Sequence, residues 1–544
     1  MIDLSRHNCL QGAFEEAFEA FSDEPCLIEA DRDRERCRLT YGEVFSAVLP
    51  LAGYLKDRGC RRAAILMTNQ SKWHIAACAV FRIGATLVPL DPKLSPDEHR
   101  ALLAHCEADT LIIEHHLWRD RDFEGRVLVT EAPPDFDLRH GARFEECRGE
   151  GAGEVSARSR TDPACIVYSS GTGGTPKGCV LTHGNYLWQC QALLGQYRFE
   201  KGDRYLSILP TNHAIDFMVG FLGPYACGAT VVHLRTLRPE LVKEAFPRYG
   251  IAFMALVPMI LKNLETGLRE RLAKKTLAKA LIGLNRLLTR RRPSLALSRL
   301  LLRPVHQGFG GKLKALFVGG AFTDPATLRF FYDLGIQVAN GYGLTEAGTV
   351  ITLNSMDDYR PDTVGLPLPG TEVRIVDAGP DGIGEVLAAG PTVMAHYLKE
   401  PELTTRTIRD GWLHTGDLGR LEPSGHLVLL GRKKNMIVTA GGKNVYPEDI
   451  ENAFEGLAVK EFCIFAEHYL WSGRSERLVI AVRSDDRDFA AELRRRNRRL
   501  PDFKRVHGFL LWERDFPRTA SLKVKRDLLA DEIRQVDPAT VESL

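Results

Sequence analysis

The feature that most constrains this chain is a loop rich in glycine and hydroxyl side chains at residues 168–178. Its sequence is Tyr-Ser-Ser-Gly-Thr-Gly-Gly-Thr-Pro-Lys-Gly. The short apolar run 164–167 before it is typical of a buried strand, and a helical pattern follows at 185–196. A strand, then such a loop, then a helix is the usual arrangement for binding a phosphate chain, so the sequence predicts a phosphate-binding loop.

The residue types in this loop suit an anionic ligand. Glycines let backbone N–H groups approach an anion closely, hydroxyls donate hydrogen bonds, and Lys177 supplies a positive charge. The loop is not a Walker loop, which requires Gly-Lys followed by Ser or Thr, because Lys177 lies between Pro176 and Gly178. The alternative is an ordinary surface loop, in which so many donors rarely occur together.

The loop resembles the nucleotide loop of the adenylate-forming superfamily, which includes acyl-CoA synthetases, luciferases and the adenylation domains of peptide synthetases. The family pattern is Ser-Gly-Thr-Thr-Gly-x-Pro-Lys-Gly, and here Gly173 replaces the second Thr, so one hydroxyl donor is missing. The resemblance implies that Thr172 stabilises the reacting phosphate and helps to hold Mg²⁺. It implies ATP contacts from Ser169, Ser170, Gly171, Thr172, Gly173, Gly174, Thr175 and Lys177.

A second stretch, residues 340–346, reads Asn-Gly-Tyr-Gly-Leu-Thr-Glu and resembles another motif of the same family. The Gly-x-Gly pattern at 341–343 would by itself suggest a dinucleotide fingerprint, but Glu346 stands where the last glycine of that fingerprint is required. The resemblance implies that Tyr342 stacks on adenine, that Thr345 donates to the α-phosphate, and that Glu346 helps to hold Mg²⁺, for which a carboxylate is a suitable ligand. The ATP contacts implied here are Gly320, Ala321, Asn340, Gly341, Tyr342, Gly343 and Thr345.

Two later motifs resemble the ribose-binding part of the family's site. Residues 411–417 end in Asp417, which the resemblance makes the acceptor of hydrogen bonds from both ribose hydroxyls, a role that suits a carboxylate. In residues 431–437, Arg432 matches a ribose-contacting arginine, and Lys434 stands where the family has its hinge, a residue that absorbs a large backbone change. The alternative for Asp417 is an aspartate that stabilises a turn.

Two more stretches would serve separate half-reactions. Residues 517–523 resemble the family's Pro-x-Thr-x-x-Gly-Lys, which makes Lys523 the candidate catalytic lysine and an ATP contact, although Leu522 replaces the usual glycine. Lys525 is a nearby competitor, but the spacing within the motif favours Lys523. Residues 439–447 would line the thioester-forming site, because glycines let a thin pantetheine arm pass. The implied CoA channel consists of Gly441, Gly442 and Lys443.

The acid-binding side of the site is predicted near residues 209–213, a Leu-Pro-x-x-His stretch. In the family such a stretch lies beside the acyl pocket, so His213 is a candidate catalytic or gating residue. Asp216, three residues on, matches an acid found in long-chain members. The alternative is a structural histidine whose hydrogen bonds are satisfied in the core.

The order of apolar runs predicts an α/β chain. Strands that alternate with helices indicate a mostly parallel sheet, and residues 363–431 have the spacing of a small antiparallel or barrel-like subdomain before a compact α+β domain. The predicted domains are 1–433, which binds ATP and the acid, and 434–544, which is mobile and carries Lys523. Residues 115–160 predict a loosely packed polar connection. Predicted strands are 62–67, 85–90, 109–114, 164–167, 205–209, 253–257, 313–318, 337–339, 372–376, 384–388, 426–430, 462–466, 478–482 and 508–512, and predicted helices are 39–58, 71–83, 96–106, 185–196, 489–499 and 525–536.

Residues 261–303 are basic and leucine-rich, with almost no acids. One interpretation is an amphipathic helical pair whose basic face meets anionic lipid. The other is a solvated basic face packed on the domain. A basic insertion at this place resembles long-chain fatty acyl-CoA synthetases more than short-chain ones.

Composition argues against several classes of protein, namely nucleic-acid-binding, zinc-binding, disulfide-rich and membrane-spanning proteins. The net charge of +2 argues against a nucleic-acid-binding surface across the chain, and twelve cysteines without a Cys-x-x-Cys pair indicate neither a zinc site nor a disulfide framework. Scattered thiols fit a reducing cytosol. The first residues lack a signal-peptide pattern, and the longest uncharged run, 217–232, predicts a buried helix followed by a strand rather than a membrane span. We expect a cytoplasmic protein, with peripheral contact to the inner membrane face open through 261–303.

Together the motifs predict an ATP-dependent acid–thiol ligase that uses Mg²⁺ and coenzyme A. The substrate carboxylate attacks the α-phosphorus, pyrophosphate leaves, and a thiol then displaces AMP, while the protein contributes placement and charge stabilisation. The segment 261–303 and the pair His213 and Asp216 favour a medium- to long-chain fatty acid. One alternative acceptor is a separate acyl or peptidyl carrier protein, since no carrier domain is expected in this chain. A second alternative is a non-catalytic nucleotide-binding paralogue, against which the retained motif residues argue.

Overall fold

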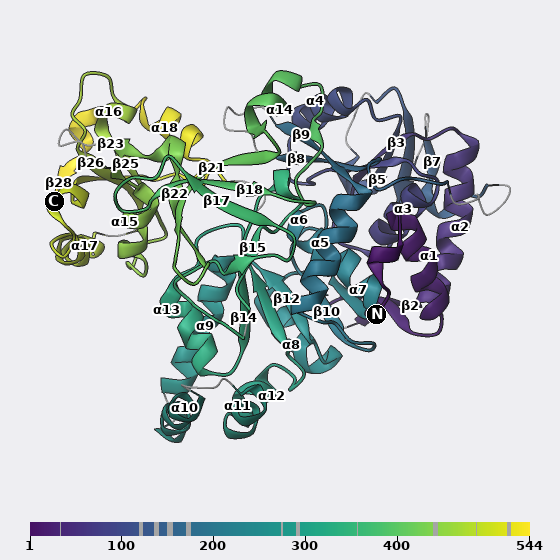
Figure 1. The fold of residues 1–544 in the computed structure, drawn as a ribbon, viewed down its shortest axis with the longest axis horizontal. Helices are drawn as coiled ribbons and strands as arrows, with labels where there is room; N and C mark the ends of the chain where they lie inside the picture. The colour runs from purple at the N-terminus through teal and green to yellow at the C-terminus, as the bar shows by residue number, and fades with distance from the viewer. Residues whose placement is uncertain are drawn as a thin grey trace. The chain divides into compact units, whose positions relative to one another are not determined.

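The computed structural model describes most of the chain as two compact units (Figure 1). Unit 1 comprises Met1–Glu372 and Ala388–Leu413, and unit 2 comprises Val373–Leu387 and His414–Leu544. Unit 2 includes all of the predicted mobile domain, and the domain boundary at residue 434 stays a prediction. The described residues are 1–32, 34–118, 123–134, 136, 141–149, 156–169, 176–273, 276–289, 294–355, 357–438, 444–485, 487–518 and 524–544.

The larger sheet of unit 1 has nine strands in the order β16–β15–β14–β13–β12–β10–β11–β1–β2. The six strands from β14 to β1 pair in parallel, whereas β2, β15 and β16 pair antiparallel at the edges. The inner strands are short and buried, as expected of a parallel sheet covered on both faces. Their bounds are β1 (Pro25–Asp31), β2 (Arg34–Thr40), β10 (Arg204–Ser207), β11 (Thr230–Leu234), β12 (Phe253–Leu256), β13 (Ala315–Val318), β14 (Gln337–Tyr342), β15 (Thr352–Leu353) and β16 (Leu366–Pro367).

The second sheet of unit 1 has eight strands in the order β19–β9–β8–β4–β3–β5–β6–β7. Strands β8 to β7 pair in parallel, and β9 and β19 extend the sheet antiparallel. The predicted α/β class with mostly parallel sheets is therefore confirmed. The bounds are β3 (Arg62–Leu66), β4 (Thr86–Pro89), β5 (Thr110–Glu114), β6 (Arg126–Thr130), β7 (Gly141–Arg143), β8 (Pro163–Ser169), β9 (Lys177–Thr182) and β19 (His396–Tyr397).

Strands β6 and β7 correct the prediction of a loose connection at 115–160. Val127 and Val129 on β6 are buried and belong to the core of the eight-stranded sheet. Five residues, mostly β-branched or apolar, are enough to add a strand to an existing parallel sheet. The polar sequence on both sides of this short run concealed it.

Strands β8 and β9 form an antiparallel hairpin around the predicted nucleotide loop, which corrects the predicted strand–loop–helix order. Ser169 at the end of β8 pairs with Lys177 at the start of β9. Helix α5 begins only at His183, with Thr182 as its N-cap. The apolar residues 179–181 are buried within the sheet, and a short buried run of that kind cannot be assigned to strand or helix by periodicity alone.

The helices of unit 1 begin at capping residues that the sequence displays. Thr40 and Glu43 form a capping box at α2, and Ser95 and Glu98 form another at α4. The uncharged run 217–232 forms a buried π-helical segment, η4 (Phe217–Leu222), then α7 and β11, as predicted. The helices are α1 (Leu10–Ala20), α2 (Tyr41–Asp57), α3 (Ser71–Arg82), α4 (Pro96–Cys106), α5 (His183–Gln196), α6 (Ala214–Asp216), α7 (Gly223–Cys227), α8 (Pro239–Tyr249), α9 (Pro258–Ala273), α10 (Thr276–Thr289), α11 (Leu295–Leu301), α12 (Arg303–Gly308), α13 (Pro325–Asp333) and α14 (Pro401–Thr407).

The helices were compared with the length and apolar content of a membrane span. Within the described ranges, none of the helices combines the length and apolar content that crossing a membrane requires. Helices α9, α12 and α13 instead pack on the nine-stranded sheet, where Leu261 and Leu328 join a core with Met254 and Val338.

Residues 372–432 form the β-rich part predicted from sequence. Its sheet is ordered β17–β18–β21–β20, and β22 pairs antiparallel with β21. The C-terminal part is an α+β fold around the four-stranded sheet β25–β26–β27–β28, also as predicted. The elements are β17 (Glu372–Val376), β18 (Gly384–Ala389), β20 (Ile408–Arg409), β21 (Trp412–Leu421), β22 (Leu427–Arg432), β23 (Ile437–Val438), β24 (Asn444–Val445), α15 (Pro447–Phe454), β25 (Glu461–Ala466), α16 (Glu467–Leu470), β26 (Leu478–Arg483), α17 (Phe489–Asn497), β27 (Val506–Leu511), α18 (Arg526–Ile533) and β28 (Glu542–Ser543).

Candidate active site

The nine-stranded sheet brings two predicted ATP motifs to one edge. Strands β13 and β14 are parallel neighbours, and Val318 pairs with Asn340 near their carboxyl ends. The segments 319–321 and 341–346 therefore leave the sheet at the same edge, where α/β sheets bind ligands. Gly320 has a φ of +83°, and among the described residues the nearest atom to a Cβ placed on it would be Ile215 Cδ1 at 4.0 Å. The turn thus leaves room beside this sheet edge.

Close packing explains why two positions of the second motif are glycines. A Cβ on Gly341 would lie 2.9 Å from Leu353 Cδ1, and a Cβ on Gly343 would lie 1.9 Å from the Thr349 carbonyl oxygen. Both contacts arise because the chain folds back from β14 onto β15. These glycines are required by the fold, so their ATP contacts stay predictions.

Glu346 links the two sheets of unit 1. It lies in a 3₁₀ turn, η5 (Thr345–Ala347), directly after β14. Its Oε1 accepts a hydrogen bond of 2.8 Å from the Tyr397 hydroxyl and one of 3.3 Å from Ser169 Oγ. Ser169 ends β8 and Tyr397 lies on β19, so residues far apart in sequence converge on one carboxylate.

Tyr397 also meets the lysine of the nucleotide loop. Lys177 Nζ lies 5.6 Å from the centroid of the Tyr397 ring. Burial, and after it the Glu346 carboxylate, raises the pKa of the Tyr397 phenol above its ordinary value, so the hydroxyl stays protonated and donates. Sequence reasoning missed Tyr397, and the only signal was its place just after the matched stretch 390–394.

The predicted nucleotide loop connects β8 to β9 in the sequence. Its described ends, Ser169 and Lys177, are paired, and both lie near Glu346 or Tyr397. The remaining predicted contacts lie outside the described residues: Ser170, Gly171, Thr172, Gly173, Gly174 and Thr175.

The other members of the second motif lie on β14 or in the turn that follows it. Asn340 is buried and its Nδ2 donates to the Thr363 carbonyl at 3.3 Å, so its side chain holds the loop after β15. Tyr342 is buried on β14 opposite Thr352. Thr345 is half-buried beside Glu346. Adenine stacking by Tyr342, and the contacts expected of Ala321 and Thr345, stay predictions.

The predicted acid-binding stretch leads into helix α6, and Asp216 at the end of that helix is buried in the core. His213 is the N-cap residue of α6, and its backbone accepts from Phe217 N at 2.9 Å. The Asp216 carboxylate is fully buried and accepts hydroxyls from Tyr205 at 2.6 Å, Ser207 at 2.9 Å and Thr211 at 3.1 Å. Burial raises the pKa of this carboxyl to about 6, and the three hydrogen bonds limit the rise.

Asp216 is therefore a core residue whose bonds hold β10 against the following turn. The match of Asp216 to an acid of long-chain members stays a prediction. A gating role for His213 stays a prediction.

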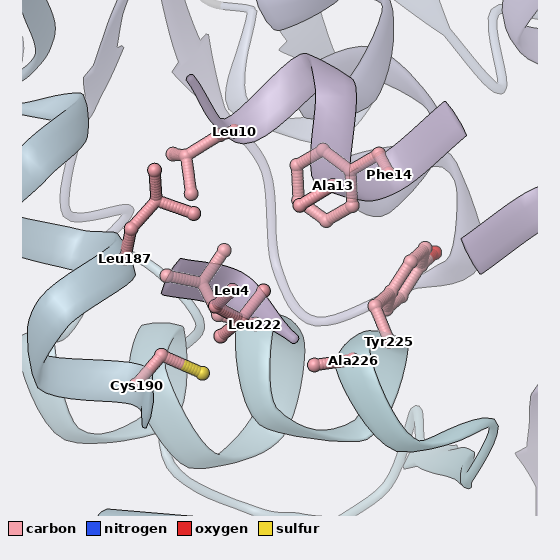
Figure 2. A pocket seen from close by; sticks show the side chains of 9 residues that line it. All are labelled: Leu4, Leu10, Ala13, Phe14, Leu187, Cys190, Leu222, Tyr225 and Ala226. Carbon is pink, nitrogen blue, oxygen red and sulfur yellow. The ribbon is translucent and has the colours of Figure 1, made fainter. Parts of the chain in front are cut away.

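A separate apolar pocket lies in unit 1 (Figure 2). It is formed between α1, α5 and α7, and none of the residues predicted for the nucleotide or the acid lines it. We therefore do not assign the acid to it. Its lining residues are Leu4, Leu10, Ala13, Phe14, Leu187, Cys190, Leu222, Tyr225 and Ala226.

In unit 2 the two predicted ribose-binding residues lie side by side. Asp417 and Arg432 are cross-strand partners on β21 and β22, and Arg432 Nε lies 2.7 Å from Asp417 Oδ1. The aspartate is mostly buried, whereas the side chain of Arg432 is 40% exposed. The ion pair fixes the carboxylate in place, which suits a group expected to bind sugar hydroxyls.

Glu385 on β18 is a second buried carboxylate in this part of unit 2. Lys433 Nζ lies 2.9 Å from its Oε2, and the Gly416 backbone N–H donates to its Oε1 at 3.2 Å. Burial is the largest influence on Glu385 and opposes its ionisation, but the hydrogen bond and charge of Lys433, the Gly416 N–H and the nearby His414 together outweigh it, so the pKa is lowered. Glu385 was not singled out from the sequence, although the stretch Gly384-Glu-Val was noted.

The predicted hinge residue is held by an ion pair within unit 2. Lys434 Nζ lies 2.9 Å from Asp527 Oδ2 at the start of α18. Asp527 also accepts from the Tyr469 hydroxyl at 2.9 Å. This contact ties the segment that contains the hinge to the helix that follows the predicted catalytic loop.

Both predicted catalytic loops of unit 2 have paired ends. Strands β23 and β24 flank 439–443, and Arg518 bridges Val524 across 519–523. The backbone N–H of Lys525 also donates to the Pro517 carbonyl at 2.7 Å. The predicted residues Gly441, Gly442, Lys443 and Lys523 lie outside the described residues.

The donors of unit 1 fit a nucleotide with a hard cation. The hydrogen bonds of Glu346 fall on Oε1, so among the described residues its Oε2 has no hydrogen-bond partner. A carboxylate oxygen is a ligand that Mg²⁺ accepts, and Lys177 at the loop end suits a phosphate.

Comparison with known proteins identifies the family. The family described as AMP-binding enzyme matches residues 14–398. The long-chain-fatty-acid–CoA ligase FadD15 of Mycobacterium bovis is 29% identical over 420 residues, which cover 72% of this chain and 68% of the relative. The indoleacetate–CoA ligase of Aromatoleum aromaticum is 26% identical over 517 residues, which cover 92% and 93%.

A solved structure shares the fold. The O-succinylbenzoate coenzyme A synthetase of Bacillus subtilis, in complex with ATP and magnesium ion, superposes with a TM-score of 0.76 at 23% identity, covering 95% of this chain and 98% of the synthetase. The family resemblance predicted from the motifs is thereby confirmed. Because the family match extends over more than half of its residues, the chain belongs to the AMP-binding enzyme family.

Proposed function

We propose that the protein is an AMP-forming acid–thiol ligase that activates a carboxylic acid with ATP and transfers the acyl group to coenzyme A. The observation that carries this proposal is that Ser169 and Tyr397 both donate hydrogen bonds to the Glu346 carboxylate, while Lys177 lies against the Tyr397 ring. Two separate motifs of a nucleotide site, 168–178 and 340–346, meet there. The CoA ligases and the synthetase among its relatives support coenzyme A as the acceptor.

The first half-reaction needs no protein nucleophile. The substrate carboxylate attacks the α-phosphorus, the bond to the bridging oxygen breaks, and pyrophosphate leaves with the electron pair. Lys177, Thr172 and Lys523 offset the negative charge that builds up. Mg²⁺, when bound through Glu346 and Thr172, supplies further charge neutralisation. Asp417 and Arg432 position the ribose, and Tyr342 positions adenine.

The second half-reaction follows a domain rotation about Lys434. The thiol of coenzyme A attacks the acyl carbon, and AMP leaves with the electrons of the carbon–oxygen bond. The loop with Gly441, Gly442 and Lys443 lines the path of the thiol. In this structure Lys434 forms an ion pair with Asp527, so the hinge residue of the rotation is bound to the start of α18.

The acid is a medium- to long-chain fatty acid in this proposal. Long-chain-fatty-acid–CoA ligases among the relatives, the leucine-rich segment 261–303 and the match of Asp216 to an acid of long-chain members support it. The indoleacetate–CoA ligase favours an aromatic acid as the second candidate. A carrier protein is the second candidate acceptor. The enzyme acts in the cytoplasm without nucleic acid as a partner.

One experiment separates these possibilities. The purified full chain is supplied with ATP, Mg²⁺ and acids from acetate to palmitate, with benzoate and indoleacetate included, and pyrophosphate release is measured. Each buried methylene contributes about 0.8 kcal/mol, or about fourfold, so release should rise steeply with chain length until the pocket is full. Mass detection then identifies the thioester formed with coenzyme A or with a carrier protein.

Each outcome has a distinct meaning. No pyrophosphate with any acid would favour the non-catalytic paralogue and end the ligase proposal. Highest release with an aromatic acid would leave the ligase intact and remove the fatty acid. A thioester on the carrier protein but not on coenzyme A would change the acceptor alone.

A further inference from the structure

The helices α9, α10 and α11 divide the leucines of the basic segment into two sets. Leu268, Leu272 and Leu281 are partly buried and pack against the core of the nine-stranded sheet. The other set faces solvent: Leu284 is 42% exposed, Leu287 69%, Leu288 51% and Leu300 72%. These last four residues are termed the leucine surface below.

The leucine surface lies on two neighbouring helices. Leu284, Leu287 and Leu288 have the spacing of a single helical face on α10, and α11 with Leu300 packs against α10. Figure 1 shows both helices at the periphery of unit 1. Of the large apolar side chains exposed on the described residues, a third fall between residues 284 and 300. Such clustering indicates an interaction surface, because monomeric proteins rarely expose contiguous apolar side chains.

The inner side of α10 fixes the outward direction of these leucines. Asn285 is fully buried, and its Nδ2 donates to the Asp333 carbonyl at 2.9 Å. Thr289 Oγ1 donates to the Asn285 carbonyl at 2.7 Å. A buried amide that is hydrogen-bonded to α13 resists rotation of the helix, so the leucine surface cannot turn inward without leaving a polar group unpaired.

Charge restricts what can cover this surface. From residue 271 to 314 the sequence has twelve lysines and arginines and no acid. Lys279 and Arg286 are exposed on α10 itself, and Arg271 and Arg303 are exposed on the adjoining helices. Arg286 is 73% exposed although it lies 3.7 Å from Asp333. Exposed leucines surrounded by cations complement a layer that is apolar inside and anionic at its face.

We propose that the leucine surface docks on an anionic lipid bilayer, with its leucines inserted among the acyl chains and its cations at the headgroups. A second copy of the chain fits less well, because a two-fold contact would bring two predominantly basic segments together, and residues 271–314 contain no acid. A nucleic acid would leave four leucines in contact with phosphates. The proposal holds whichever acid the enzyme activates.

The test measures retention of the full chain on vesicles of phosphatidylcholine alone and of phosphatidylcholine with phosphatidylglycerol. Retention is expected on the anionic vesicles and should fall with added salt, since the attraction is partly electrostatic. Serine at Leu284, Leu287 and Leu288 should weaken retention by about tenfold or more. Charge reversal at Lys279 and Arg286 to Glu should weaken it by about tenfold.

Leu237→Ser is the matched control, because Leu237 is also 53% exposed but lies outside these helices. It should retain wild-type binding, and all variants should keep wild-type circular dichroism. Equal retention on both vesicle types, or none on either, would overturn the proposal. So would retention that survives the serine changes, because the leucines would then not insert. A concentration-dependent dimer that the serine variant abolishes would assign the surface to a second copy instead.

Discussion

The hydroxyl of Tyr397 donates a 2.8 Å hydrogen bond to Oε1 of Glu346, and thereby couples β19 of one sheet to the turn that ends β14 of the other. The bond orients the carboxylate that we propose as a magnesium ligand. Loss of this donor leaves Glu346 charged and, among the described residues, held only by the longer hydrogen bond of 3.3 Å from Ser169 Oγ. A change at Tyr397 therefore alters the orientation of the Glu346 carboxylate, whereas a change at Glu346 alters its charge.

Tyr397→Phe should raise the Mg²⁺ concentration needed for half-maximal pyrophosphate release by about tenfold or slightly more, because a hydrogen bond to a charged group contributes about 1.5 kcal/mol or slightly more. Release at saturating Mg²⁺ should change much less. Manganese binding in the presence of ATP, followed by electron paramagnetic resonance, provides a readout apart from turnover. Tyr197→Phe is the control, since Tyr197 donates to the Asn354 carbonyl in the core. An equal shift in both variants would remove Tyr397 from the site.

Glu346→Gln should keep the fold and lower Mg²⁺-dependent activity by an order of magnitude or more, because a charged oxygen ligand becomes neutral. The amide can still accept from Tyr397 and Ser169, so the packing of η5 is retained. A Mg²⁺ titration of the purified variant measures the effect. An unchanged titration would show that another residue holds the ion.

Asp216 should make stability depend on pH in unit 1. Its folded pKa of about 6 lies above the unfolded value near 4, so the folded state binds the proton more tightly. Relative to Asp216→Asn, the wild type is therefore most stable below about pH 4 and loses up to about 3 kcal/mol as pH rises to about 6. Above that pH the difference should stay level.

Urea unfolding of both proteins at a series of pH values measures this difference. Ser207→Ala serves as a further variant, because it removes a hydrogen bond that favours the ionised Asp216 carboxylate. The folded pKa of Asp216 should then rise, so the loss of stability should continue to a higher pH. A difference between wild type and Asp216→Asn that is the same at every pH would contradict the assigned burial of the charge.

The two half-reactions should respond to different variants. Lys523→Ala removes a charge near the reacting phosphate and should lower adenylation by about 10²-fold or more, while a supplied acyl-adenylate is still converted to thioester at nearly the normal rate. Gly442→Leu should block the path of the thiol and leave adenylation largely intact. Lys434→Pro restricts the hinge and should impair thioester formation more than adenylation.

Separate assays of adenylate formation and of thioester formation measure these effects. Asp527→Asn is an additional variant, because it removes the ion-pair partner of Lys434 without changing the hinge backbone. Equal losses in both half-reactions for Lys523→Ala and Gly442→Leu would show that the protein does not alternate between two domain orientations.

Much of this protein was determined by local sequence. The glycine and hydroxyl loop, the stretch 340–346 and the late motifs around Asp417 and Lys523 identified the family, because their chemistry depends on residue types at fixed short spacings. Capping residues such as Thr40 placed helix starts, since a cap acts within one turn. Element types were right wherever a periodic apolar run was long.

Only the tertiary structure decided strand pairing, side-chain contacts and exposure, because these depend on residues far apart in the chain. The β9 strand forms only because β8 and β19 lie on either side of it, so the predicted strand–loop–helix order failed. Tyr397 donates a hydrogen bond to Glu346, 51 residues earlier in the chain, and the Asp216 carboxylate is buried among hydroxyls. Periodicity gave the leucines of 261–303 a helical spacing, but only packing against the sheet determined which of them remain exposed.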